Sequence, residues 1–385
     1  MEERYKIVYC TLSLYIAGGV KRALTMKANY FADVYGYNIT IILTDGKGKP
    51  HFYLLSDKGK VINIVIDFDE LWRYIFFGQI LPNLRKQRIF KKKQTAEMMR
   101  IRPDVTVCLL RREINFLTKI KDGSKKIGEL HVNKLNFRTF KDIDTNFFKK
   151  LFSKYWVAIT IPSLKRLDKF VVLTNEDKAV WTELYNVVSI PNPISFEVDT
   201  ISKLKRKRVI AVGRYDYVKV YDRLLKARRI VEDECPDWHL DVYGKDDQKE
   251  CIEDAANSLG MNIHVYPPTN SIFDCYRNSS ILVSTSLYEP FGLVIPEVIS
   301  CGLPTIAYDC LYGPASVIED GINGFLMKMD DREMMIRKII MLMNDLCLRR
   351  KMGEVAYKSS SSYSAVLIML LWKNLFYSLL TKKTV

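Results

Sequence analysis

Two glutamates at fixed spacing carry the strongest chemical signal in this sequence. Glu289 and Glu297 lie in the string STSLYEPFGLVIPEVISCGLP, which begins at Ser284. The preceding apolar run predicts a strand ending at Ser284, followed by a loop with Glu289 and a helix opening near Leu293. Carboxylates there can accept hydrogen bonds from sugar hydroxyls. The structural alternative is a helix-start carboxylate at Glu297, favoured by the helix dipole, with a surface charge at Glu289.

The same string predicts a phosphate site. The amino end of a helix offers unbonded N–H groups and the positive end of a dipole. Gly292 allows the backbone to approach an anion closely. The main-chain groups expected to bind phosphate are those of Phe291, Gly292, Leu293 and Val294.

A second signal is a pair of cations after the predicted strand Val209–Val212. Gly213 and Arg214 end that strand, and Lys219 follows five residues later. Arg can grip two phosphate oxygens and Lys acts as a point charge, so together they can stabilise a departing pyrophosphate. The alternative is an ordinary basic loop beside the charged run Lys203–Arg208.

Two weaker signals lie in the first half of the chain. Gly18 and Gly19 form a turn between the first predicted strand and helix, where glycines are common for steric reasons alone. The turn does not match G-x-G-x-x-G, which argues against a nicotinamide site. His131 follows a predicted strand and can hydrogen-bond a donor sugar or an acceptor hydroxyl. A lone histidine is also often purely structural.

The elements that must position these residues alternate between short apolar strands and helices. This pattern predicts two α/β units, each with a doubly wound parallel sheet. The prolines of Pro191-Asn192-Pro193 exclude helix and mark a boundary. We expect an N-terminal domain over 1–190, a C-terminal domain over 191–362, and a final helix over about 363–385 that packs back on the first domain. Predicted strands include Ile7–Leu12, Asn38–Leu43, Val61–Ile66, Val105–Leu110, His239–Tyr243, Ile263–Tyr266 and Ile281–Ser284, and predicted helices include Val20–Tyr35, Asn175–Leu184, Tyr221–Asp233, Asp247–Leu259 and Val294–Cys301.

The excess of positive over negative charge lies entirely in the first half of the sequence. Residues 1–190 hold 34 Lys and Arg against 19 Asp and Glu, whereas residues 191–385 hold 25 of each. Residues 71–93 combine an aromatic and aliphatic stretch with a basic run, a composition suited to an anionic membrane surface or to nucleic acid. The alternative is a solvated helix face. The sequence shows no signal peptide and no regular cysteine framework, so we expect a cytoplasmic protein with reduced thiols.

Taken together, these motifs resemble those of retaining family-4 glycosyltransferases of the GT-B fold, in particular bacterial enzymes of capsule, O-antigen and exopolysaccharide assembly. Glu289 to Glu297 resembles the family's E-x(7)-E motif, and Gly213-Arg214 with Lys219 resembles its G-R…K element. Gly18-Gly19 and His131 are similar to the glycine loop and cleft histidine of its first domain. The resemblance implies that Gly18 and Gly19 bind the donor and that His131 takes part in catalysis. The likeness covers nearly all of residues 5–330.

This resemblance implies transfer from a nucleoside diphosphate sugar, most readily a UDP-sugar, with retention at the anomeric carbon. Arg214 and Lys219 would neutralise the diphosphate in place of a metal, so neither a metal nor another cofactor is expected. Glu297 would bind ribose hydroxyls, and Glu289 would position the donor sugar. Tyr266 and Pro267 would frame the base.

The resemblance also implies a glycan or lipid-linked saccharide as acceptor, reached at the inner face of the cell membrane. An alternative enzyme is a nucleotide-sugar epimerase of similar two-domain fold, which acts on donor without acceptor. A basic nucleic-acid-binding protein is the non-enzymatic alternative. It leaves the neutral second half and its motifs unexplained, so nucleic acid is not expected as a partner.

Overall fold

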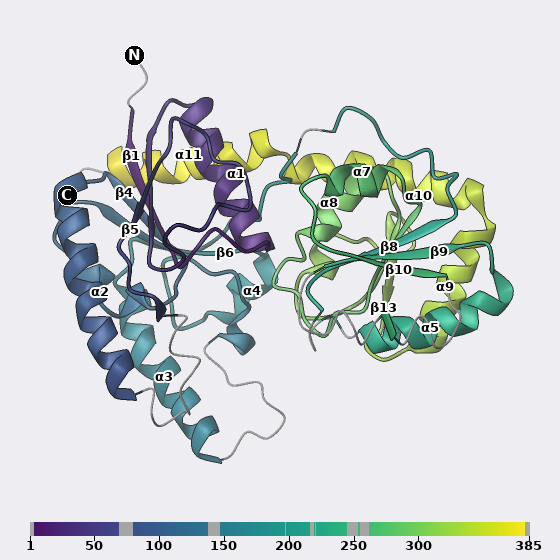
Figure 1. The fold of residues 1–385 in the computed structure, drawn as a ribbon, viewed down its shortest axis with the longest axis horizontal. Helices are drawn as coiled ribbons and strands as arrows, with labels where there is room; N and C mark the ends of the chain where they lie inside the picture. The colour runs from purple at the N-terminus through teal and green to yellow at the C-terminus, as the bar shows by residue number, and fades with distance from the viewer. Residues whose placement is uncertain are drawn as a thin grey trace. The chain divides into compact units, whose positions relative to one another are not determined.

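The computed structural model describes residues 4–68, 80–137, 147–196, 198–215, 219, 221–244, 253–254 and 262–381. The chain divides into two compact units. The first comprises Met1–Pro191 with Met369–Val385, and the second comprises Asn192–Ile368. Each is a parallel α/β unit, as predicted (Figure 1). The predicted helix Asp247–Leu259 lies almost wholly outside the described residues.

The first unit is built on a seven-stranded sheet in the order β3-β2-β1-β4-β5-β6-β7, with every neighbouring pair parallel. The β1 strand is almost completely buried because the sheet is covered on both faces. The strands are β1 Lys6–Thr11, β2 Asn38–Leu43, β3 Lys60–Asn63, β4 Val105–Cys108, β5 Lys125–Glu129, β6 Lys169–Val172 and β7 Val187–Ser189.

Helices cover both faces of this sheet. Figure 1 shows α1 and α11 on one face and α2 and α3 on the other. The second face holds a core that includes Val8, Cys108, Phe90 and Leu164. The helices are α1 Gly19–Asp33, α2 Ile80–Ile101, α3 Phe147–Lys165, α4 Asn175–Val180 and α11 Ala365–Thr381, with short 3-10 turns at Glu113–Asn115, Leu117–Lys119 and Lys134–Asn136.

The predicted strand Val61–Ile66 is too long. The strand ends at Asn63, whose side-chain Oδ1 accepts the Val65 N–H at 2.9 Å and whose Nδ2 donates to the Asp45 carbonyl at 2.9 Å. Val65 then adopts a φ of 51°, which no strand tolerates. The predicted strand Val105–Leu110 is also too long, because β4 ends at Cys108 and Leu110 has a positive φ of 51°.

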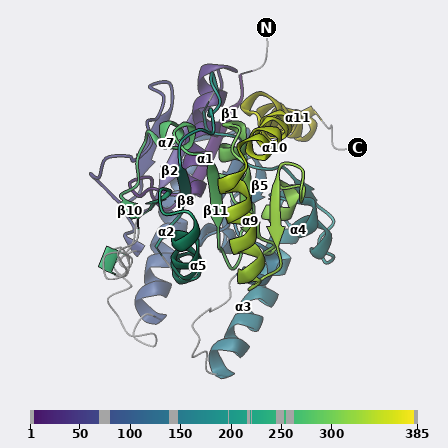
Figure 2. The ribbon, with the colours of Figure 1, turned by 90° about the vertical axis from the view of Figure 1, so that its right-hand side faces the viewer.

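The second unit has a six-stranded parallel sheet in the order β10-β9-β8-β11-β12-β13. Figure 1 shows α7, α8 and α10 on one face and α5 and α9 on the other, and Figure 2 shows α5 beside α9. The strands are β8 Arg208–Val212, β9 His239–Tyr243, β10 Ile263–Tyr266, β11 Ile281–Ser284, β12 Thr305–Tyr308 and β13 Gly324–Met327. The helices are α5 Tyr221–Glu234, α7 Ile272–Arg277, α8 Val294–Ser300, α9 Arg332–Asn344 and α10 Leu346–Ser359, with 3-10 turns at Pro314–Ser316 and Ser360–Tyr363.

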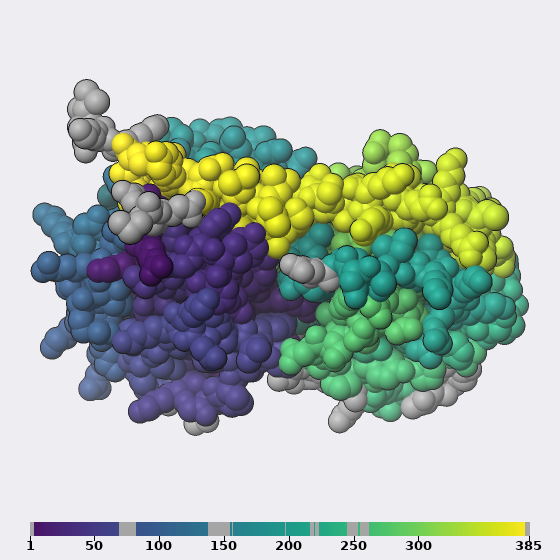
Figure 3. Space-filling view, turned by 90° about the horizontal axis from the view of Figure 1, so that it is seen from above, coloured from purple at the N-terminus to yellow at the C-terminus, as the bar shows by residue number. Residues whose placement is uncertain are grey.

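The C-terminal helix α11 packs on α1 through aromatic side chains. Phe376 is fully buried with its ring centroid 5.2 Å from that of Phe31, and Lys373 Nζ lies 4.5 Å from the ring centroid of Tyr35. Figure 3 shows the yellow helix at the surface beside the purple N-terminal segment. By length and composition alone, Leu346–Thr381 would pass for a membrane span among the described residues. The buried side of α11 instead belongs to the core of the first unit.

Candidate active site

The predicted donor residues follow the strands at the topological switch point of the second sheet. From β8 the strands follow one another outward through β9 to β10 at one edge of the sheet. The chain then returns to β11, on the other side of β8, and continues outward through β12 to β13 at the opposite edge. The loops after β8 and β11 therefore diverge from each other and leave room for a ligand beyond the carboxyl ends of these strands. Gly213, Arg214 and Lys219 follow β8, and Glu289 follows β11.

Lys219 lies directly across the backbone of Gly213. A Cβ atom at position 213 would lie 2.4 Å from Lys219 Cε and 2.8 Å from its Cδ, so only glycine leaves room for the lysine side chain. The Gly213 N–H donates to the Tyr243 carbonyl at 3.0 Å, and the Lys219 carbonyl accepts the Thr285 hydroxyl at 2.7 Å. These bonds tie the β8 loop to β9 and to the residue after β11.

The ammonium group of Lys219 is held by Glu289. Lys219 Nζ lies 2.5 Å from Glu289 Oε1, and Ser286 Oγ donates to the same oxygen at 2.8 Å. The lysine side chain is 20% exposed and the glutamate side chain 13%, so the pair is largely shielded but still reachable from solvent. A partly desolvated cation fixed in this way can neutralise an anion at little further cost in conformational entropy.

The backbone of Glu289 is fixed on both sides. Its N–H donates to the Leu311 carbonyl at 3.1 Å, and its carbonyl accepts the N–H groups of Tyr312 at 3.0 Å and Gly313 at 2.8 Å. Gly292 has a φ of 69°, in the left-handed region that favours glycine. The Ile295 N–H donates to the Gly292 carbonyl at 2.8 Å, so the predicted phosphate-binding groups from Phe291 to Val294 precede the first bonded turn of α8.

Glu297 is fully buried in α8, and Tyr276 of α7 donates its hydroxyl to Glu297 Oε2 at 3.1 Å. The carboxylate therefore joins the two helices that cover this face of the sheet. Its predicted role in binding ribose stays a prediction.

The remaining predicted donor residues lie at the ends of β8 and β10. Arg214 is exposed and follows Gly213 directly. Tyr266 stacks on Tyr243 with ring centroids 4.7 Å apart, and its carbonyl accepts the Tyr215 hydroxyl at 2.8 Å. Burial raises the pKa of Tyr266. Pro267 is exposed beside it.

In the first unit, His131 stands over a buried ion pair. His131 Nε2 lies 3.1 Å from Glu129 Oε1, and the same carboxylate oxygen pairs with Lys27 of α1. Burial raises the pKa of Glu129, but the charge of Lys27 and the contact with His131 outweigh it and hold the pKa at about 2. The carboxylate is therefore ionised at neutral pH and can orient the imidazole.

The C-terminal helix completes this arrangement. Lys27 Nζ lies 4.6 Å from the ring centroid of Trp372 of α11, which is also buried. Glu129 also raises the pKa of the buried Tyr9 hydroxyl, after the larger effect of burial. His131 thus contacts Glu129 of β5, which pairs with Lys27 of α1, and Trp372 of α11 packs against that lysine.

The loop carrying Gly18 and Gly19 is held by Tyr53. The Gly18 N–H donates to the Tyr53 hydroxyl at 3.2 Å, and Arg22 Nε approaches the same oxygen at 3.4 Å. Gly19 is exposed and opens α1.

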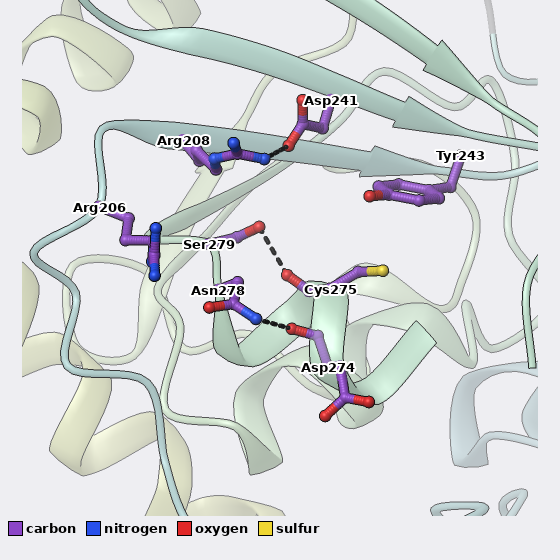
Figure 4. A pocket seen from close by; sticks show the side chains of 8 residues that line it. All are labelled: Arg206, Arg208, Asp241, Tyr243, Asp274, Cys275, Asn278 and Ser279. Atoms are coloured by element: carbon purple, nitrogen blue, oxygen red, sulfur yellow. Dashed lines mark hydrogen bonds and ion pairs between the residues drawn. The ribbon is translucent and has the colours of Figure 1, made fainter. Parts of the chain in front are cut away.

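A cavity of about 350 Å³ lies elsewhere in the second unit, between α7 and the strands β8 and β9 (Figure 4). Arg208 donates to Asp241 Oδ2 at 2.9 Å in its wall. Its lining comprises Arg206, Arg208, Asp241, Tyr243, Asp274, Cys275, Asn278 and Ser279, and includes none of the predicted donor residues.

Several partners of the site residues were not predicted from the sequence. Thr285 and Ser286 directly follow the predicted strand end at Ser284. Their position in the sequence could therefore have indicated that they lie close to the site residues. Glu129 is two residues before His131, but nothing local indicated its pairing with Lys27, 102 positions away. Within the described ranges, no group of three or more His, Cys, Asp or Glu side chains is arranged to hold a metal ion.

Comparison with known proteins defines the class of this chain. Residues 196–359 match the family described as glycosyl transferases group 1. An uncharacterized glycosyltransferase of Haemophilus influenzae is 25% identical over 376 residues, which is 96% of this chain and 99% of that protein. The amylovoran biosynthesis glycosyltransferase AmsD of Erwinia amylovora is 30% identical over 220 residues, 54% of this chain and 62% of that protein.

The fold also matches solved structures. A crystal structure of an S. aureus TarM mutant in complex with fondaparinux, alpha-GlcNAc-glycerol and UDP superposes with a TM-score of 0.75 at 17% identity, covering 97% of this chain and 99% of that one. The chain therefore has the GT-B fold, and residues 196–359 of its second unit are similar to the glycosyl transferases group 1 family. It is a glycosyltransferase.

Proposed function

We propose that the chain is a retaining, metal-independent glycosyltransferase that moves a sugar from a UDP-sugar to a glycan or lipid-linked saccharide in surface polysaccharide synthesis. The observation that carries this proposal is the cluster of Gly213, Lys219 and Glu289 beyond the switch point of the second sheet. It places a fixed cation where a ligand of such a sheet binds. UDP is bound in the similar TarM mutant structure, and amylovoran synthesis is the process named for the Erwinia relative.

The proposed chemistry assigns one task to each side chain. Lys219 and Arg214 neutralise the diphosphate as the bond from the anomeric carbon to the diphosphate oxygen breaks. The Lys219 ammonium has three donors, so it can bind phosphate while it keeps its bond to Glu289. The second oxygen of Glu289 then accepts from a hydroxyl of the sugar. His131, held by Glu129, hydrogen-bonds the sugar or the acceptor hydroxyl.

A donor screen tests this function. Purified protein is heated with UDP-, GDP- and dTDP-sugars, and a rise in melting temperature selects the donor. Slow hydrolysis of that donor is then followed by NMR with and without EDTA. We expect a UDP-sugar to stabilise the protein, and the first free sugar to keep the donor's anomeric configuration at an unchanged rate in EDTA. An inverted product, a rate abolished by EDTA, or conversion to an epimeric nucleotide sugar would each contradict part of the proposal.

The proposal also includes contact of α2 with an anionic membrane. Residues 71–79 of the predicted contact region lie outside the described residues, but α2 presents exposed Leu84 and Ile89 beside exposed Arg85 and Arg88. Two lysines of the basic run instead make hydrogen bonds within the first unit. The Lys86 ammonium donates to the Asp67 carbonyl, and the Lys93 ammonium donates to the Ile64 carbonyl at 2.7 Å. In liposome flotation we expect the protein to float only with vesicles that contain anionic lipid. If the protein floated with neither anionic nor neutral vesicles, membrane contact would be contradicted.

A further inference from the structure

Two loops are joined at the carboxyl ends of β1 and β2 in the first unit. The Thr44 and Asp45 N–H groups donate to the Leu12 carbonyl at 3.0 and 2.9 Å, and the Phe52 N–H donates to the Leu14 carbonyl at 2.9 Å. The β1–α1 loop and the loop after β2 therefore form one surface. This is the end of a parallel sheet at which ligands bind.

Tyr15 holds two lysines on this surface. Its ring packs on Gly46, where an added Cβ would lie 2.4 Å from Tyr15 Cδ1, so the ring rests directly on the backbone. Lys49 Nζ lies 4.2 Å from the Tyr15 ring centroid and Lys21 Nζ 5.8 Å from it. One aromatic ring thus lies near the ammonium groups of two lysines.

Tyr53 holds a third cation next to the glycine loop. The Arg22 guanidinium lies 5.5 Å from the Tyr53 ring centroid, and the tyrosine hydroxyl also accepts the Gly18 N–H. Arg22 is therefore fixed next to the opening of α1, where the helix dipole adds further positive potential.

The two segments that make this surface contain no carboxylate. Residues 15–22 and 46–53 hold Lys21, Arg22, Lys47, Lys49 and His51, and neither Asp nor Glu. Asp45 adjoins the second segment, but it is 1% exposed and its carboxylate accepts the Thr44 hydroxyl at 2.5 Å. We call Lys21, Arg22, Lys47, Lys49 and His51 the basic loop cluster.

We propose that the basic loop cluster binds phosphate groups of the acceptor, so that the acceptor is a phosphate-bearing glycan, polyol phosphate or lipid-linked diphosphate rather than a neutral saccharide. This inference rests on the proposed function and specifies its acceptor. The cluster lies within residues 1–190, which carry a net charge of +15, whereas the predicted donor cations lie within residues 191–385, whose net charge is zero. The planar guanidinium of Arg22 would bind phosphate oxygens, and Lys21 and Lys49 would serve as point charges.

Binding measurements with defined probes test this inference. Fluorescent oligo(glycerol phosphate) represents a phosphodiester, farnesyl diphosphate a lipid diphosphate, and maltohexaose a neutral glycan. We compare the wild type with Lys21→Ala/Lys49→Ala. The matched control is Lys121→Ala/Lys178→Ala, which removes two exposed cations elsewhere in the first unit. UDP affinity is measured by calorimetry on the same preparations, and thermal unfolding checks that each variant is folded.

We expect the wild type to bind at least one phosphate-bearing probe and not maltohexaose. The loop variant should lose about tenfold or more in that affinity and show a weaker salt dependence, while the control stays within about twofold. UDP affinity should be unchanged in both. The inference would be overturned if the loop variant and the control lost the same affinity for the phosphate-bearing probe. Tight binding of maltohexaose alone would also overturn it. A loss of UDP affinity in the loop variant would assign the cluster to the donor instead. If the wild type bound phosphate probes but no nucleotide, the proposed function would fail while this inference stood.

Discussion

Replacing Gly213 with alanine should damage the donor site without damaging the fold. The φ of Gly213 lies outside the left-handed region, so alanine can adopt the same backbone. The added Cβ, however, would lie 2.4 Å from Lys219 Cε, where carbon atoms normally stay about 3.5–4.0 Å apart. Lys219 must therefore move by about 1 Å or more, away from its 2.5 Å contact with Glu289.

The size of the effect follows from the part that Lys219 plays. Misplacing a catalytic group by about 1 Å can reduce turnover about 10²-fold, and removing one preorganised charge costs about 10²–10³-fold. We expect Gly213→Ala to lower sugar transfer or donor hydrolysis by about 10²-fold, with an unchanged melting temperature. In a Lys219→Ala background there is no side chain to displace, so the added Gly213→Ala should change turnover by less than about twofold.

The double-mutant cycle makes this reasoning refutable. Gly59→Ala serves as the control, because a Cβ there meets only the Ser56 carbonyl at 3.4 Å. Near-normal turnover of Gly213→Ala, or effects of the two substitutions that simply multiply, would show that Lys219 does not act through its place on Gly213.

Two further predictions concern the first unit. Because Glu129 has its pKa lowered from 4.5 to about 2, its ionised form stabilises the fold by about 3 kcal/mol above pH 4.5, and this stabilisation disappears as the pH falls to 2. Urea unfolding from pH 7 to pH 3 should therefore show a steeper loss for the wild type than for Lys27→Met/Glu129→Gln, which removes both charges; parallel curves would contradict the assignment. Phe376→Ala removes a fully buried ring from α11 and should lower the free energy of unfolding by about 3–5 kcal/mol while UDP affinity is retained, and a loss below about 1 kcal/mol would mean that α11 does not belong to this core.

The sequence predicted the order of the elements well wherever local signals agree. The strands Asn38–Leu43, His239–Tyr243, Ile263–Tyr266 and Ile281–Ser284 have the predicted bounds. Each is a short apolar run between polar turns. The early end of β3 was not predictable in the same way, because it depends on side-chain bonds of Asn63 to Val65 and to Asp45, in another part of the chain.

Several helices were not among those predicted from the sequence. A helix over part of residues 71–93 was considered only as an alternative, because basic residues dominate the surface of α2. The helix α3 contains Pro162, a residue that usually ends a helix. The helices α9 and α10 carry none of the chemical motifs and were not predicted.

Within the donor cluster, sequence spacing predicted which residues follow which strand, but not their contacts. That Lys219 lies on Gly213 and bonds Glu289 depends on the twist of neighbouring strands and on a turn of the β8 loop. The burial of Glu297 had a local signal, since Ile295, Pro296, Val298 and Ile299 surround it with apolar residues. The burial of Lys27 had none, because its partner is remote in the chain.

Calorimetric titration of nucleotides tests the central claim most directly. UDP, GDP and uridine are titrated into the wild type and into Arg214→Ala/Lys219→Ala. If these two cations hold the paired phosphates, the affinity for the nucleoside diphosphate should fall by about 10²-fold or more in the variant, whereas uridine should bind both proteins equally weakly. A folded variant that binds UDP or GDP within about twofold of the wild type would contradict the claim.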